Sequence, residues 1–277
     1  MPRIFKFLSC AVLCLGWVGL TDAKDENGEP TLDQVWAFAT TSQPIEARNI
    51  LDDLEGLEPR VETLAEVVLA LARPPISKGD WKDIEPVLAN LSEEDDEIAA
   101  RALYLQARMY QVHMPTPDYV RAEELYREIA QRWPGSHWAQ LGYVKLGLVK
   151  LYALAEPTDS EVRFAEVQVL LDQITEPTLH RDLQLQIGRA GMFHERPLDE
   201  VLPHLIAADA VPGMLGITPE ELKIQIGELS FRAGHLEQSK LYFEEFLAEY
   251  PSNIRRFNVR QQLKKVLAAL GETEASP

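Results

Sequence analysis

The stretch QRWPGSHWAQLG, residues 131–142, recurs in part as AEYPSNIRRF, residues 248–257. In each stretch an aromatic residue precedes a proline, small polar residues follow, and an apolar segment begins soon afterwards. Proline lacks the backbone N–H that a helix interior needs and clashes with the preceding turn, so a helix tends to end before it. A serine or asparagine just beyond can accept hydrogen bonds from the first amides of the next helix. Each stretch therefore predicts a tight joint between two helices.

The two joints give specific expectations for helix ends. In the first joint we expect Trp133 to end one helix and Ser136 to cap the next. In the second we expect Tyr250 to end a helix and Ser252 or Asn253 to cap the last one. The aromatic side chain before each proline is expected to lie at the interface between the joined helices.

The flanking sequence repeats as well. Residues 183–212 align without gaps on residues 222–251, an offset of 39. The identical pairs are Leu183 and Leu222, Gln186 and Gln225, Ile187-Gly188 and Ile226-Gly227, Leu202 and Leu241, and Pro212 and Pro251. A glycine inside a helix costs about 1 kcal/mol relative to alanine, so its recurrence indicates a neighbouring helix that crosses too closely for a side chain. A repeat of this length is typical of a stacked array of helices.

These residues resemble the tetratricopeptide repeat, a family of two-helix units. In 220–253 the matching positions are Ile226, Gly227, Gly234, Ser239, Phe243 and Pro251. In 103–136 they are Ala122, Tyr126, Ile129 and Pro134, and in 181–214 they are Ile187, Gly188 and Pro212. The last of these units departs from the pattern, with Glu200 in the small-residue position and His204 in the aromatic position. The aromatic-Pro-Ser ending is also similar to that of the envelope-associated periplasmic subset of the family.

The resemblance implies an all-α fold: a right-handed superhelical solenoid of stacked antiparallel helix pairs, about six pairs plus a C-terminal capping helix. We expect divergent helix pairs over 31–94, repeats over 95–251, and the capping helix and tail over 252–277. Thr31 or a neighbouring residue is expected to cap a helix that runs to Thr40, and Pro86 to lie near the first turn of a helix.

The N-terminus reads as an export signal over 1–23, followed by a leader over 24–30. Two basic residues precede an uncharged apolar run of 14 residues, 7–20. That run is short for a membrane span, which needs about 20 residues, although a retained anchor stays an alternative. We therefore expect a periplasmic or secreted protein. Both cysteines, Cys10 and Cys14, lie in this segment, so the mature chain has no thiol for a disulfide, catalysis or a metal.

The charge is strongly acidic, with a formal net charge of −17, which argues against nucleic acid as a partner. One short segment is the opposite: residues 252–265 contain no acid and five basic residues. This basic patch consists of Arg255, Arg256, Arg260, Lys264 and Lys265. It is interpreted either as the solvated face of the last helix or as a docking face for an acidic partner. That partner is the protein's own N-terminal half or an anionic lipid surface, and any membrane contact is expected to be peripheral only.

No catalytic, cofactor or metal site is predicted. The six histidines are scattered and form no metal-binding spacing, and no phosphate-binding loop or nucleophile elbow occurs. The acidic run 93–97 lacks the spaced ligands of a calcium loop and is interpreted as a solvated helix start.

The remaining candidate is a partner-binding groove. The resemblance places six residues on the concave face, where the first helices of successive pairs lie. They are Leu185, Arg189, Met192, Ile224, Glu228 and Phe231. An apolar surface with one charge of each sign suits an amphipathic or extended peptide. The alternative is that Met192 and Phe231 pack inside the protein. Some family members bind acidic chain termini with lysine and asparagine at these positions, and this sequence does not match them.

The sequence therefore favours an exported, non-catalytic scaffold of the cell envelope that binds a protein or peptide. A hydrolase or lyase on a helical toroid is one alternative, and it requires acids and histidines that converge in one cleft. A structural spacer is the other, and it predicts a uniformly polar concave face.

Overall fold

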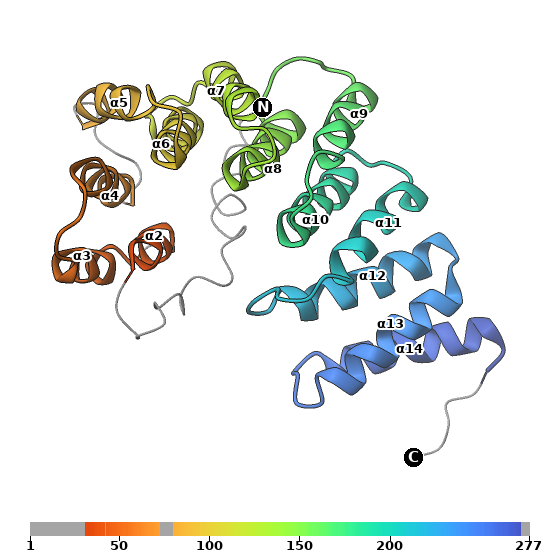
Figure 1. Cartoon of the computed structure of the whole chain (residues 1–277). Helices are drawn as coiled ribbons and strands as arrows, with labels where there is room; N and C mark the ends of the chain where they lie inside the picture. Colours follow the sequence, from red (N-terminus) through yellow and green to blue (C-terminus); the bar gives the residue numbers. More distant parts are fainter. Residues whose placement is uncertain (1–30, 42, 73–79, 273–277) are drawn as a thin grey trace. The chain divides into compact units, whose positions relative to one another are not determined.

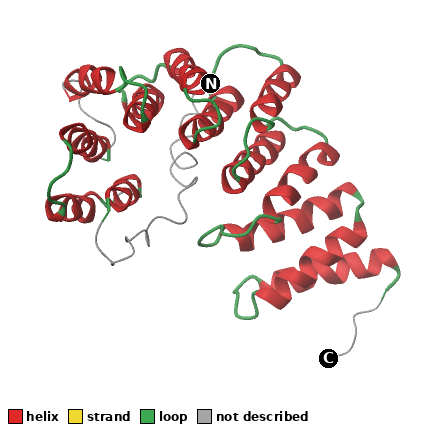
Figure 2. Ribbon diagram, viewed as in Figure 1, coloured by secondary structure: helices red, strands yellow, loops and turns green. Residues whose placement is uncertain are grey.

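The computed structural model describes residues 31–41, 43–72 and 80–272. These residues form 13 α-helices and one short π-helical segment, and they contain no strand (Figure 2). The chain divides into two compact units, one up to Leu179 and one from His180 onward. The predictions of a signal peptide over 1–23 and a leader over 24–30 fall outside the described residues. Among the described helices, none combines the length and the apolar character that a bilayer span requires.

The first unit contains the helices up to α9 and the start of α10. Their bounds are α2 (Leu32–Thr40), α3 (Pro44–Asp53), α4 (Pro59–Leu71), α5 (Asp80–Leu91), α6 (Glu97–Arg108), the π-helical segment η1 (Met109–His113), α7 (Tyr119–Arg132), α8 (His137–Tyr152) and α9 (Ser160–Leu171). Each of these α-helices contacts the next one along the chain. In addition α2 contacts α4, α4 contacts α6, and α6 contacts α8, so these four helices form one continuous layer of the first unit (Figure 1).

The second unit continues the alternation. Its helices are α10 (Pro177–Phe193), α11 (Leu198–Asp209), α12 (Thr218–Ala233), α13 (Leu236–Glu249) and α14 (Arg256–Leu270). From α11 to α14 each helix contacts its successor, and α12 also contacts α14. Two buried clusters hold this unit together, one around Leu205 and Ile226 and one around Phe243 and Phe246. The all-α prediction is thus confirmed for the described residues, and the helices pack as consecutive pairs.

The first joint forms as predicted. Trp133 is the C-cap of α7, and its backbone N–H donates to the carbonyl of Ile129. Ser136 is the N-cap of α8, with its hydroxyl accepting from the Ala139 amide at 3.2 Å. Gly135 between them has a φ of 78°, a left-handed conformation that glycine adopts without strain.

The second joint differs from the prediction. Tyr250 is the C-cap of α13, but the N-cap of α14 is Arg255, not Ser252 or Asn253, and no side chain caps this helix. The side-chain oxygen Oδ1 of Asn253 accepts from the Arg255 backbone amide at 2.8 Å, while its side-chain NH₂ group donates to Glu220 on α12. The cap prediction was wrong because Asn253 instead closes a short turn before the helix and ties that turn to α12.

The repeated glycines lie at close helix crossings, as the repeat predicts. A Cβ built on Gly227 of α12 would lie 2.6 Å from Cε1 of Phe243 on α13. A Cβ on Gly188 of α10 would lie 2.8 Å from Cγ of Leu205 on α11. Ordinary Cβ contacts are longer than these distances, so each glycine admits its neighbour where alanine would not. The unit with His204 in the aromatic position therefore packs closely through the next residue, Leu205.

Of the two other predicted helix starts, one is confirmed and one is wrong. Thr31 caps α2 in a reciprocal capping box with Gln34, as predicted. Pro86 does not lie in a first turn but inside α5, six residues after its start at Asp80. The helix extends farther toward the N-terminus than Pro86 alone indicates, because Asp80 and Asp83 favour its first turn through the helix dipole.

Candidate functional site

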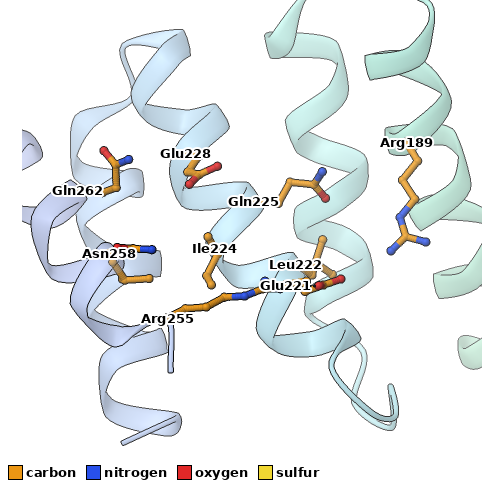
Figure 3. A pocket seen from close by; sticks show the side chains of 10 residues that line it. Arg189, Glu221, Leu222, Ile224, Gln225, Glu228, Arg255, Asn258 and Gln262 are labelled. Carbon is orange, nitrogen blue, oxygen red and sulfur yellow. Dashed lines mark hydrogen bonds and ion pairs between the residues drawn. The ribbon is translucent and has the colours of Figure 1, made fainter. Parts of the chain in front are cut away.

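The second unit contains a cavity of about 470 Å³ between α10, α12 and α14 (Figure 3). Its lining residues are Arg189 from α10, Glu221, Leu222, Ile224, Gln225 and Glu228 from α12, and Arg255, Asn258, Val259 and Gln262 from the start of α14. These are the first helices of two successive pairs and the last helix of the chain. The cavity therefore lies within the second unit, on the side where α12 contacts α14.

Three of the six predicted groove residues line this cavity: Arg189, Ile224 and Glu228. Leu185 does not, because only 2% of it is exposed and it packs in the cluster around Leu205. The prediction that Leu185 faces an open groove was therefore wrong.

Met192 and Phe231 are half-buried. They pack against the two apolar clusters of the unit, Met192 on one and Phe231 on the other. Neither side chain lines the cavity. Both follow the alternative in which they belong to the interior.

The sequence did not lead us to expect that the start of α14 forms a wall of the cavity. Arg255, Asn258 and Gln262 follow one another at spacings of three and four residues, which puts them on one helix face. The basic residues dominate this segment, and the two amides four residues apart, Asn258 and Gln262, are the sequence signal for the wall. The face becomes a cavity wall because the buried Val259 and Leu263 fix the rotation of α14.

Two contacts hold α14 at the edge of the cavity. The Arg255 guanidinium lies 2.9 Å from the Glu221 carboxylate, and in Figure 3 its side chain extends below Ile224 toward that acid. Asn253, just before the helix, donates to Glu220. Both partners lie in the first turn of α12, so the beginnings of α12 and α14 are tied side by side.

Three polar side chains of the cavity have no partner within the protein. Arg189, Glu228 and Asn258 make no hydrogen bond or ion pair with any residue that the structure describes. Together they offer a guanidinium, a carboxylate and an amide around the apolar Ile224 and Leu222. The arrangement can bind a ligand that has both hydrogen-bond donors and acceptors.

The basic patch divides between two surfaces. Arg255 belongs to the cavity wall, while Arg256 donates to the carbonyl oxygen of Pro251 at 2.6 Å. Lys265 donates to Gln262 at 3.2 Å. Arg260 and Lys264 lie on exposed parts of α14. Arg255 and Arg256 are therefore engaged at the start of α14, whereas Arg260, Lys264 and Lys265 lie exposed farther along the helix.

A second hollow of about 430 Å³ lies between α11 and α13. It contains a histidine–carboxylate pair. His235 Nε2 lies 2.6 Å from Asp199 Oδ1. The described lining contains no serine, threonine or lysine that this pair could activate. Across the described residues, no three potential metal ligands come together.

No known protein family matches the chain, and a search of curated proteins finds no similar sequence. The site is accordingly interpreted from its own geometry.

Proposed function

We propose that this protein is an exported, non-catalytic scaffold of tetratricopeptide type that binds a peptide segment of a partner protein in the cavity between α10, α12 and α14. The observation that carries the proposal is the set of unpartnered polar groups around an apolar floor. Arg189, Glu228 and Asn258 line the same cavity of about 470 Å³ as Ile224.

A peptide segment fits this chemistry. An extended peptide presents backbone N–H and C=O groups that have no partner of their own, and a side-chain amide offers one donor group and one acceptor to match them. Asn258 and Gln262 provide two such amides one helical turn apart. Ile224 offers apolar contact, and the opposite charges of Arg189 and Glu228 favour a segment that contains both signs.

The architecture supports the tetratricopeptide part of the proposal. Helices pack consecutively, α2 to α13 make six pairs, and α14 follows as a single helix. Gly188 and Gly227 mark close crossings within their pairs. A right-handed superhelix of these pairs is the arrangement that the resemblance implies. Export rests on the N-terminal sequence, and the envelope is the corresponding proposed location.

Selection of a random peptide library displayed on phage against residues 24–277 tests this function. We expect enrichment of peptides with a shared motif, and we expect Asn258→Ala to weaken their binding by about tenfold, the effect of one lost hydrogen bond. Glu228→Gln is expected to weaken peptides with a basic residue more than neutral ones. Arg232→Gln, at an exposed position on the same helix outside the cavity, is the matched control.

Equal affinity of the Asn258→Ala variant and the unaltered protein for every selected peptide would show that the cavity is not the binding site. A structural spacer would enrich no peptide at all. Circular dichroism melting of each variant separates a loss of binding from a loss of fold.

A further inference from the structure

Four large apolar side chains project into solvent at one end of the second unit. Leu215 and Ile217 precede α12 and are 63% and 64% exposed, and Ile254 and Phe257 flank the start of α14 with 96% and 71% exposed. The loops that carry them lie on the same side of the unit (Figure 1). Exposed apolar residues are common singly, but a group of this size at loop tips indicates contact with something other than water.

The two loops are held together by polar contacts. Arg255 pairs with Glu221 at 2.9 Å, and Asn253 donates to Glu220. These contacts join the first turn of α12 to the turn before α14. The four apolar side chains therefore belong to one edge. We call this edge, together with Arg260, Lys264 and Lys265 of α14 beside it, the basic-apolar edge.

The α14 part of this edge has a charge opposite to that of the whole chain, while the first turn of α12 contributes Glu220 and Glu221. No acidic residue occurs over 252–265, although the chain has a formal net charge of −17. Along α14, Lys264 lies two turns after Phe257 on the same outward face, and Arg260 and Lys265 lie on either side of that face. Arg260 has no partner among the described residues, and its guanidinium is free to meet an anion.

We propose that the basic-apolar edge docks the protein onto an anionic lipid surface. Ile254 and Phe257 enter the interfacial region, while Arg260, Lys264 and Lys265 lie against the lipid headgroups. Apolar burial and headgroup attraction add in such contacts. A fluid lipid surface accommodates separate protruding side chains, whereas a protein partner needs a matching hollow for each. A second copy of the same edge is disfavoured, because its basic residues would face those of the first.

Vesicle flotation of residues 24–277, which retain every described helix, tests the proposal. We expect the protein to float with phosphatidylcholine vesicles that contain phosphatidylglycerol and not with phosphatidylcholine alone, and added salt to reduce the binding. In a double variant that combines Arg260→Gln with Lys264→Gln, the loss of each positive charge is expected to weaken vesicle binding about fivefold. Ile254→Ser with Phe257→Ser is expected to weaken it at least as strongly.

Matched controls are Arg232→Gln for charge and Val169→Ser, 62% exposed on α9, for apolar surface. Both are expected to float like the unaltered protein. Equal flotation with and without anionic lipid, or equal losses in control and edge variants, overturns the proposal. Binding of an acidic peptide by the edge without flotation assigns the edge to a protein partner instead. The Asn258→Ala variant should float normally, so failure here is distinct from failure of peptide binding.

Discussion

At the scale of single residues, Gly227 shows how one missing side chain organises a helix pair. The ring of Phe243 occupies the space that a Cβ would need, and both residues are buried. Close approach also lets Ser239 of α13 donate to the Gly227 carbonyl at 2.7 Å, a buried hydrogen bond between helices. The helix-propensity cost of glycine is thus offset by aromatic packing and a hydrogen bond that a larger residue would prevent.

We expect Gly227→Ala to destabilise the protein by about 1–3 kcal/mol, because the Phe243 ring has to move from a packed position. Gly142→Ala is the control. Its Cβ would lie 3.6 Å from Tyr126 Cδ1, an ordinary contact, so the gain in helix propensity should leave stability equal or higher. Urea unfolding followed by circular dichroism measures both. Equal destabilisation by the two substitutions would contradict the close-crossing explanation.

At the scale of elements, the ends and faces of helices differ in how far local sequence determines them. Ser136 and Thr31 cap helices as their sequence predicts, since an N-cap needs only amides two or three residues away. Asn253 does not cap α14, because its side-chain oxygen accepts from the Arg255 amide in the turn before the helix and its NH₂ group donates to Glu220 on another helix. Local chemistry thus specifies a cap unless a distant partner competes for the same side chain.

A partly buried ion network joins three consecutive elements of the second unit. Lys223 on α12, only 12% exposed, lies 3.3 Å from Asp209 at the end of α11 and 3.0 Å from Glu245 on α13. Burial lowers the pKa of the Lys223 ammonium, but the hydrogen bond to Glu245 and the charge of Asp209 outweigh it, and the net direction is upward. Burial raises the pKa of Asp209.

We expect Lys223→Met to destabilise the protein by about 2–3 kcal/mol. It leaves Asp209 and Glu245 facing each other without a cation, and the exposure of Glu245 reduces the cost that a fully buried pair would have. Lys240→Met is the control, since its ion pair with Glu272 lies at the surface, and little change is expected. Thermal melting of both variants is the measurement. Similar melting temperatures for the two would show that the network contributes no more than a surface pair.

At the scale of the whole molecule, stability should fall as the pH falls below neutrality. His113, at the end of η1, has a buried Nδ1 without a hydrogen-bond partner among the described residues. Burial, together with the charge of Arg108, lowers the pKa of this imidazole from 6.5 to about 3. The unfolded chain then binds one more proton than the folded chain throughout the window between these values, so acid favours unfolding.

We expect His113 to be neutral in the folded protein, so it lowers the free energy of unfolding little above about pH 6.5. Between pH 7 and pH 5 the free energy of unfolding should fall by about 2 kcal/mol. His113→Leu should remove this part of the pH dependence. Asp96, whose pKa is lowered chiefly by its hydrogen bond with Arg60, loses its contribution only at lower pH. Urea midpoints measured across this range give the comparison. Parallel curves for the protein and the variant would exclude His113 as the source.

The sequence by itself determined the helical character, most helix boundaries and the positions of the closest crossings. These depend on local properties: proline stops, short-range caps and a glycine that recurs where a helix would otherwise avoid it. Only the tertiary structure decided which side chains surround the cavity. Leu185 and Arg189 are one turn apart on α10, yet one is buried in the core and the other lines the cavity. The difference arises from the rotation of α10 and α14 against α12, which is set by packing between residues far apart in the chain.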